Sequence, residues 1–97
     1  MNQTLRLVMP DSLEAVYCNQ LLIRHTSSEV TIDAFVVSPD QRAVRVRSRL
    51  VMTPVTAKAL LQALADNLDD YESTYGPIHL PDDLRLAAEF FGIEEDE

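Results

Sequence analysis

Arginines recur at alternate positions in one short segment of the chain. Arg45, Arg47 and Arg49 lie two residues apart and follow Arg42, so half of the eight basic residues fall within eight positions. Because strand side chains alternate between the two faces of a sheet, the first three would form one row. Such a row can bind phosphates, carboxylates or an acidic helix. The competing interpretation is an exposed sheet face that its charge keeps soluble.

Carboxylates cluster further along the chain. Asp66, Asp69 and Asp70 stand at i, i+3 and i+4, on one face of an expected helix, and Glu72 follows. They could chelate a hard cation, but a straight helix rarely offers the six or more oxygens that calcium takes. We therefore expect these aspartates to form a solvent-exposed face of the helix and not a metal site. The macrodipole disfavours acids in the C-terminal half of a helix, so a basic group on this chain or on a partner is expected to compensate.

The remaining reactive residue types are isolated from one another. His25 and His79 have no neighbour at zinc-ligand spacing, and Cys18 has no histidine partner in a recognisable motif. Glycines occur only at Gly76 and Gly92, which excludes the glycine-rich phosphate-binding loops. We therefore expect no catalytic, cofactor or metal site, no small-molecule substrate, and no enzymatic activity.

Composition indicates one small acidic domain. The chain has 97 residues, 46% hydrophobic and 25% charged, with a net charge of −8. This charge makes duplex nucleic acid and anionic membranes unfavourable partners. The single cysteine suits a reducing compartment, and no apolar run approaches the length of a membrane span or a signal-peptide core. We expect a cytoplasmic protein with protein partners.

Alternating and β-branched segments predict an antiparallel sheet within residues 13–53. The three expected strands are 17–24, 30–37 and 42–52, separated by short turns at 27–28 and 38–40. Residues 1–12 are expected to form an N-terminal arm or a fourth, edge strand. The fold class expected is α+β, with a three-stranded, or four-stranded, antiparallel meander.

A long helix is expected at 54–76. Thr53-Pro54 is a capping threonine followed by a first-turn proline, and Gly76-Pro77 provides the stop. Between them, apolar residues recur at steps of three and four: Ala57, Leu60, Leu61, Leu64, Leu68, Tyr71 and Tyr75. A short helix at 81–91 and an acidic tail at 93–97 complete the expected order.

One helix can cover only one face of a three-stranded sheet. We expect the long helix to pack on the face that carries Val44, Val46, Leu50 and Met52, which leaves the other face open. Open faces and edges favour homo-oligomerisation. The candidate partner-binding residues on the open face are Leu22, Phe35, Val37, Arg45, Arg47 and Arg49.

Several ordered landmarks resemble a prokaryotic family of small proteins known as domain of unknown function 3467. They are residues 17–21 (YCNQL), 47–54 (RSRLVMTP), 57–58, 60–61, 63–64, 71–72 and Gly76-Pro77-Ile78. The resemblance implies no assigned activity.

The order of elements also resembles the SecB-type export chaperones, in which a meander is followed by a long helix, a proline-bearing crossover and a short helix. This resemblance implies an acidic, cytoplasmic oligomer that binds extended apolar segments of unfolded chains. The present chain is shorter and shows three clear strands where the chaperone has four, so tetramer geometry and binding residues are not carried over.

The leading expectation is therefore a non-enzymatic, homo-oligomeric protein-binding module, with a SecB-like chaperone or adaptor as its most concrete form. The alternative is a small regulatory or scaffold subunit of a larger complex, docked through the strand face that carries Arg45, Arg47 and Arg49.

Overall fold

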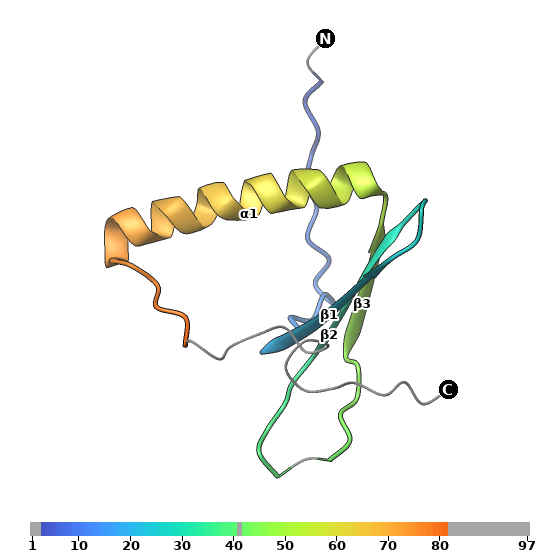
Figure 1. Cartoon of the computed structure of the whole chain (residues 1–97). Helices are drawn as coiled ribbons and strands as arrows, with labels where there is room; N and C mark the ends of the chain where they lie inside the picture. Colours follow the sequence, from blue (N-terminus) through green and yellow to red (C-terminus); the bar gives the residue numbers. More distant parts are fainter. Residues whose placement is uncertain (1–2, 41, 82–97) are drawn as a thin grey trace.

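The chain forms a three-stranded antiparallel sheet followed by one long helix (Figure 1). The computed structural model describes residues 3–40 and 42–81. Their elements are β1 (Gln20–His25), β2 (Val30–Phe35), β3 (Ser48–Met52) and α1 (Pro54–Tyr75), with strand order β1-β2-β3. The predicted α+β meander-then-helix order is confirmed. The expected acidic tail, and all but the first residue of the expected short helix, lie outside the described residues.

A tight turn at residues 26–29 connects β1 to β2. The backbone N–H of Thr26 donates to the Glu29 carbonyl at 2.9 Å, and the Thr26 hydroxyl accepts from the backbone N–H groups of Ser28 and Glu29 at 3.2 Å each. Threonine and serine hydroxyls satisfy turn amides in this way. The turn fixes a register in which His25 pairs with Val30 and Gln20 with Phe35.

The third strand is shorter than the sequence predicts. β3 begins at Ser48, so within the expected strand 42–52 only the last five residues are assigned to the sheet. Arg47 still donates its backbone N–H to the Ala34 carbonyl at 2.8 Å. Residues 3–16 form no strand, so the expected four-stranded alternative is not seen in the described part of the chain.

The helix begins and ends where the sequence predicts. The Thr53 hydroxyl accepts from the Thr56 N–H at 3.2 Å, and Pro54 occupies the first turn. At the other end Gly76 adopts φ 97°, a left-handed conformation that glycine tolerates best, and its N–H donates to the Glu72 carbonyl. Glu72 also accepts from the Ile78 N–H through Oε2 at 2.7 Å.

The expected packing of the helix on the sheet is wrong. Figure 1 shows α1 starting near the end of β3 and running back at an angle, apart from the strands, and none of its 22 residues is buried. Ile23 and Leu50, on the face that the helix was expected to cover, are 49% and 55% exposed. The tight connection at Thr53-Pro54 directs the helix away from the strand that precedes it.

The small core lies on the opposite face. Leu22 and Phe35 are buried there, and Val37 and Val44 pack against them. Asn19 fixes the adjoining backbone: its side chain accepts from the Val37 N–H at 2.8 Å and donates to the Val37 carbonyl at 3.0 Å. One asparagine thus extends the β1–β2 pairing beyond the strand ends.

Candidate functional site

Strand register divides the sheet into two chemically different faces. Residues paired across an antiparallel sheet project to the same side. The first surface, here the Asp33 face, carries Gln20, Leu22, Arg24, Thr31, Asp33, Phe35, Arg49 and Val51. The second, here the Ile23 face, carries Leu21, Ile23, His25, Val30, Ile32, Ala34, Ser48, Leu50 and Met52.

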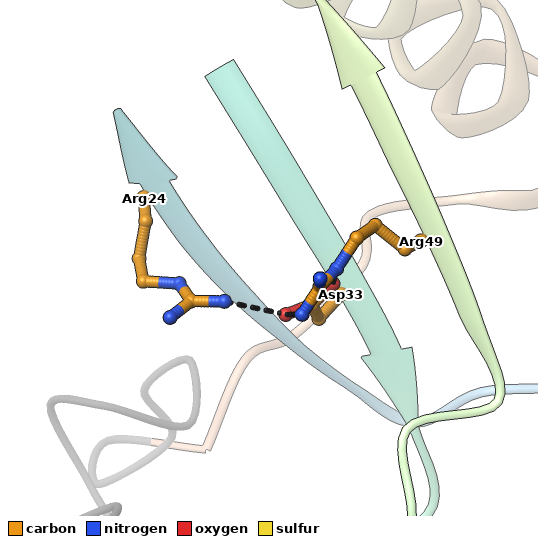
Figure 2. Close-up of polar contacts among 3 residues, drawn as sticks. All are labelled: Arg24, Asp33 and Arg49. Atoms are coloured by element: carbon orange, nitrogen blue, oxygen red, sulfur yellow. Dashed lines mark hydrogen bonds and ion pairs between the residues drawn. The ribbon is translucent and has the colours of Figure 1, made fainter. Parts of the chain in front are cut away.

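Asp33 is the centre of the Asp33 face. Its side chain is almost fully buried, and both carboxylate oxygens are bound by arginines from the two neighbouring strands. Arg49 Nε donates to Oδ1 at 2.6 Å and Arg49 Nη2 to Oδ2 at 3.0 Å, a two-point contact. Arg24 Nη2 donates to Oδ2 at 2.9 Å from the other side (Figure 2). The three side chains therefore connect all three strands.

The two arginines keep Asp33 ionised. The hydrogen bond from Arg49 is the largest influence and lowers the pKa of the Asp33 carboxyl below its ordinary value of 3.8, against the opposing effect of burial. The positive charges of Arg49 and Arg24 lower it further. At neutral pH the group is a charged acceptor with strong donors already in place, which makes it a poor general base. Its role is therefore structural: its ion pairs with Arg24 and Arg49 hold the three strands together, and we call these ion pairs the Asp33 brace.

The structure contradicts the expected exposure of two predicted site residues. Leu22 and Phe35 were expected on an open surface, but both are buried in the core of the Asp33 face. Val37 is partly buried against them. Val44 was expected on the face of Leu50 and Met52, but it packs against Leu22 and Phe35, because residue 44 lies before β3 begins and does not follow the alternation of that strand.

The three predicted arginines have different surroundings. Arg49 contacts Asp33 from within β3, whereas Arg45 and Arg47 are exposed and lie before the strand begins. Among the described residues, no carboxylate lies within ion-pair distance of Arg45 or Arg47. The row therefore divides into one arginine that holds the fold together and two that face solvent.

The exposed large apolar side chains include three groups, and others, among them Val51 on the Asp33 face, lie outside these groups. The first is the Ile23 face of the sheet, at Ile23 and Leu50. The second is the N-terminal arm, where Leu5 is 85% exposed and Leu7, Val8 and Met9 are also exposed. The third is α1, where the exposed set is Val55, Leu60, Leu61, Leu64, Leu68, Tyr71 and Tyr75. Exposed apolar residues become candidate sites of association where they form a contiguous patch.

The acidic residues of the helix are exposed. Asp66, Asp69 and Asp70 all face solvent on α1. Within residues 3–40 and 42–81, no group of three or more histidine, cysteine, aspartate or glutamate side chains is placed to hold a metal ion. Beside the β1–β2 turn, Arg24, His25, Thr26 and Thr31 line a shallow, open depression.

The sequence places Gln20 and Asp33 on the same face as the arginines, but it did not reveal that both are buried, that Asp33 binds two arginines, or that Asn19 bonds to the Val37 backbone. Asp33 stands between apolar neighbours in a β-branched run, and this interruption, two strand positions from an aromatic core residue, was the available signal. For Asn19, the sequence offers only the general preference of asparagine for turns, which does not indicate its bonds to the Val37 backbone. Gln20 is buried with its Oε1 lacking a hydrogen-bond partner, a feature that only the packing reveals.

Comparison with protein-family models identifies a match that spans residues 2–80 and is described as a protein of unknown function, DUF3467. The chain belongs to this family. The match covers every strand and the helix described above. No match was found among curated proteins or among solved structures. Within the described residues, no helix of this DUF3467 protein has the length and apolar character needed to cross a membrane.

Proposed function

We propose that this DUF3467 protein is a non-enzymatic, homo-oligomeric protein-binding module of the cytoplasm. Its most concrete form is a SecB-like chaperone or adaptor that binds extended apolar segments of other chains. The observation that carries the proposal is the half-exposed apolar Ile23 face, which ends at the edge strand β3.

The edge of β3 provides the backbone part of such a binding site. β3 is the last strand in the order β1-β2-β3, so within the described residues its outer peptide groups have no neighbouring strand. An extended client segment can add to such an edge as a further strand. Main-chain hydrogen bonds of this type are independent of the client's sequence, which suits a module with many clients.

The Ile23 face provides the apolar part. Every second side chain of an added strand would point to this face, where it would lie beside Leu50 of β3, with Ile32 of β2 and Ile23 of β1 continuing the apolar row across the sheet. Each square ångström of apolar surface covered contributes about 25 cal/mol before the cost of ordering the client. The exposed leucine and isoleucine therefore favour alternating apolar clients.

Charge adds selectivity to this binding. The chain carries sixteen acidic and eight basic residues. Acidic surface attracts basic clients over the length set by ionic screening and increases their association rate. We expect binding of basic unfolded chains to be faster at low ionic strength.

Suppression of aggregation tests the proposal. Reduced lysozyme, a basic chain that aggregates when unfolded, is mixed with the protein and followed by light scattering. The native chain should suppress the scattering, and the double variant Ile23→Gln, Leu50→Gln should lose most of this effect. The control, Val55→Gln with Leu80→Gln, changes two apolar residues that lie away from the Ile23 face and are even more exposed, at 79% and 72%. Equal suppression by both variants, or none by the native chain, would contradict the proposal.

A second function is supported by the two solvent-facing arginines. Arg45 and Arg47 lie exposed in the segment that leads into β3, where they can bind carboxylates of a larger assembly. In this alternative the chain is a regulatory or scaffold subunit. The variant Arg45→Gln, Arg47→Gln would then lose a copurifying partner and keep its suppression of aggregation.

A further inference from the structure

The exposed apolar residues of α1 follow a coiled-coil spacing. Steps of four, three, four, three and four residues separate Ala57, Leu61, Leu64, Leu68, Tyr71 and Tyr75, which we name the α1 seam. Alternating steps of three and four are the a and d positions of a heptad repeat, and they place these residues along one line of the helix. Such a line is the contact surface of paired helices.

Nothing in the described chain covers this seam. Leu61 is 64% and Tyr75 is 74% exposed, and no residue of α1 is buried. Tyr71 and Tyr75 pack together with ring centroids 4.9 Å apart, so the seam ends in one aromatic pair. The opposite side of the helix carries the acidic residues Asp66, Asp69 and Asp70, at heptad positions that point away from a paired helix.

We infer that the α1 seam pairs antiparallel with the α1 seam of a second copy, about a twofold axis that passes near Asp66. This inference rests on the homo-oligomeric part of the proposed function and specifies its interface. With residue 66 at the centre, each seam residue faces the residue of the other helix that lies equally far from residue 66 in the opposite direction along the chain. The facing pairs are Ala57 with Tyr75, Leu61 with Tyr71 and Leu64 with Leu68.

Side-chain size supports this register. The smallest seam residue, Ala57, lies opposite Tyr75, one of the two largest, at each end of the pair. Leu64 and Leu68 of both copies meet at the centre. Alternation of small and large residues lets two helices approach closely without voids.

Charge distinguishes the antiparallel from the parallel arrangement. The one basic residue of α1, Lys58, lies in its first half, and the acids Asp66, Asp69, Asp70 and Glu72 lie in its second half. A parallel pair would place eight carboxylates side by side. The antiparallel pair places each acidic half beside the N-terminal half of the other helix, where Lys58 and the positive end of the macrodipole lie. It therefore reduces the repulsion between the acidic halves of the two helices.

Engineered disulfides test the pairing. The experiments use the full chain with Cys18→Ser, which removes the single native thiol. Asn67 lies beside the seam and close to the proposed axis, so Asn67→Cys should form a disulfide-linked dimer under mild oxidation. Asp66→Cys is the matched control: it lies at the same level and points outward, and it should stay monomeric on a denaturing gel.

A third cysteine distinguishes helix direction. Tyr75→Cys lies about 27 Å from its counterpart in the antiparallel pair, at 1.5 Å per residue, and should not cross-link. In a parallel pair the two cysteines would be adjacent. Cross-linking of Tyr75→Cys, or equal cross-linking of Asn67→Cys and Asp66→Cys, would overturn the inference.

A charge placed in the seam provides the complementary measurement. Leu64→Asp should weaken dimerisation by roughly 100-fold or more in sedimentation, because it brings two carboxylates into an apolar contact. Gln62→Asp adds the same charge on the outer side and should leave the dissociation constant within about threefold. A native chain that is monomeric at all concentrations would refute both this inference and the homo-oligomeric function. A dimer that Leu64→Asp does not weaken would refute the α1 interface alone.

Discussion

Asp33 shows how one buried charge organises a small sheet. Removing a carboxylate from water is costly, and that cost is offset here by three charge-assisted hydrogen bonds from two strands. Such a cluster adds less net stability than its short distances suggest, but the loss of one partner leaves a buried charge poorly compensated. The cluster also favours one register of the sheet, because slipping β2 by one residue would move the Asp33 carboxylate to the Ile23 face, away from both arginines.

The first prediction concerns Arg49. Arg49→Gln removes the two-point contact with Asp33 and should lower the free energy of unfolding by about 1–2 kcal/mol. Arg45→Gln removes an exposed arginine and should change it by no more than about 0.5 kcal/mol. Urea denaturation followed by circular dichroism measures both. Equal effects of the two substitutions would show that the brace does not stabilise the sheet.

The second prediction concerns acid. The folded pKa of Asp33 lies below its ordinary value of 3.8, so the unfolded chain takes up the proton first as pH falls. The contribution of Asp33 to stability is therefore complete well above pH 4 and is lost as the pH falls through the folded pKa. Asp33→Asn should destabilise the protein at pH 7, and the difference from the native chain should shrink towards pH 3. A difference independent of pH would assign the effect to packing instead.

At the scale of elements, local signals predicted more than nonlocal ones. Both helix ends were predictable because Thr53-Pro54 and Gly76-Pro77 act within one turn of chain. The start of β3 was not, because the alternation of residues 42–47 does not reveal that the sheet pairing begins only near Arg47. The direction of α1 depends on the backbone angles at one connection, which composition and periodicity do not encode.

The candidate site was predicted in part for the same reason. Alternation placed Leu22, Phe35 and Arg49 on one face correctly, because the period of two is a local property of strands. Whether that face is buried depends on which other segments cover it. The Asp33 brace was missed because its partners lie nine and sixteen residues away in sequence, on two different strands.

The third prediction tests the helix cap. Thr53→Ala removes the hydroxyl that accepts from the Thr56 N–H and should destabilise α1 by about 1 kcal/mol. Thr74→Ala removes a hydroxyl that only donates back to the Asp70 carbonyl, so it should be close to neutral. The ellipticity at 222 nm during thermal melting compares the two. A larger loss for Thr74→Ala would contradict the assignment of Thr53 as the cap.

At the scale of the whole molecule, the sheet and the helix have different sources of stability. The sheet has its own small core around Leu22 and Phe35 and its own polar brace. The helix has neither, because none of its residues is buried and no basic residue offsets the acids in its last turns. A helix with no buried residue gains little stability from packing within the described part of the chain. The proposed pairing with a second copy would supply that stability.

The last prediction follows from this difference. If α1 is stabilised by pairing with a second copy, dilution should remove helix and dimer together, because mass action couples the two. The ellipticity at 222 nm should fall over the same concentration range in which sedimentation shows dissociation. Leu64→Asp should have low helicity at every concentration, while Gln62→Asp should follow the native chain. Full helicity in a diluted, monomeric sample would show that α1 is stable alone, and the seam would then be a surface for another partner.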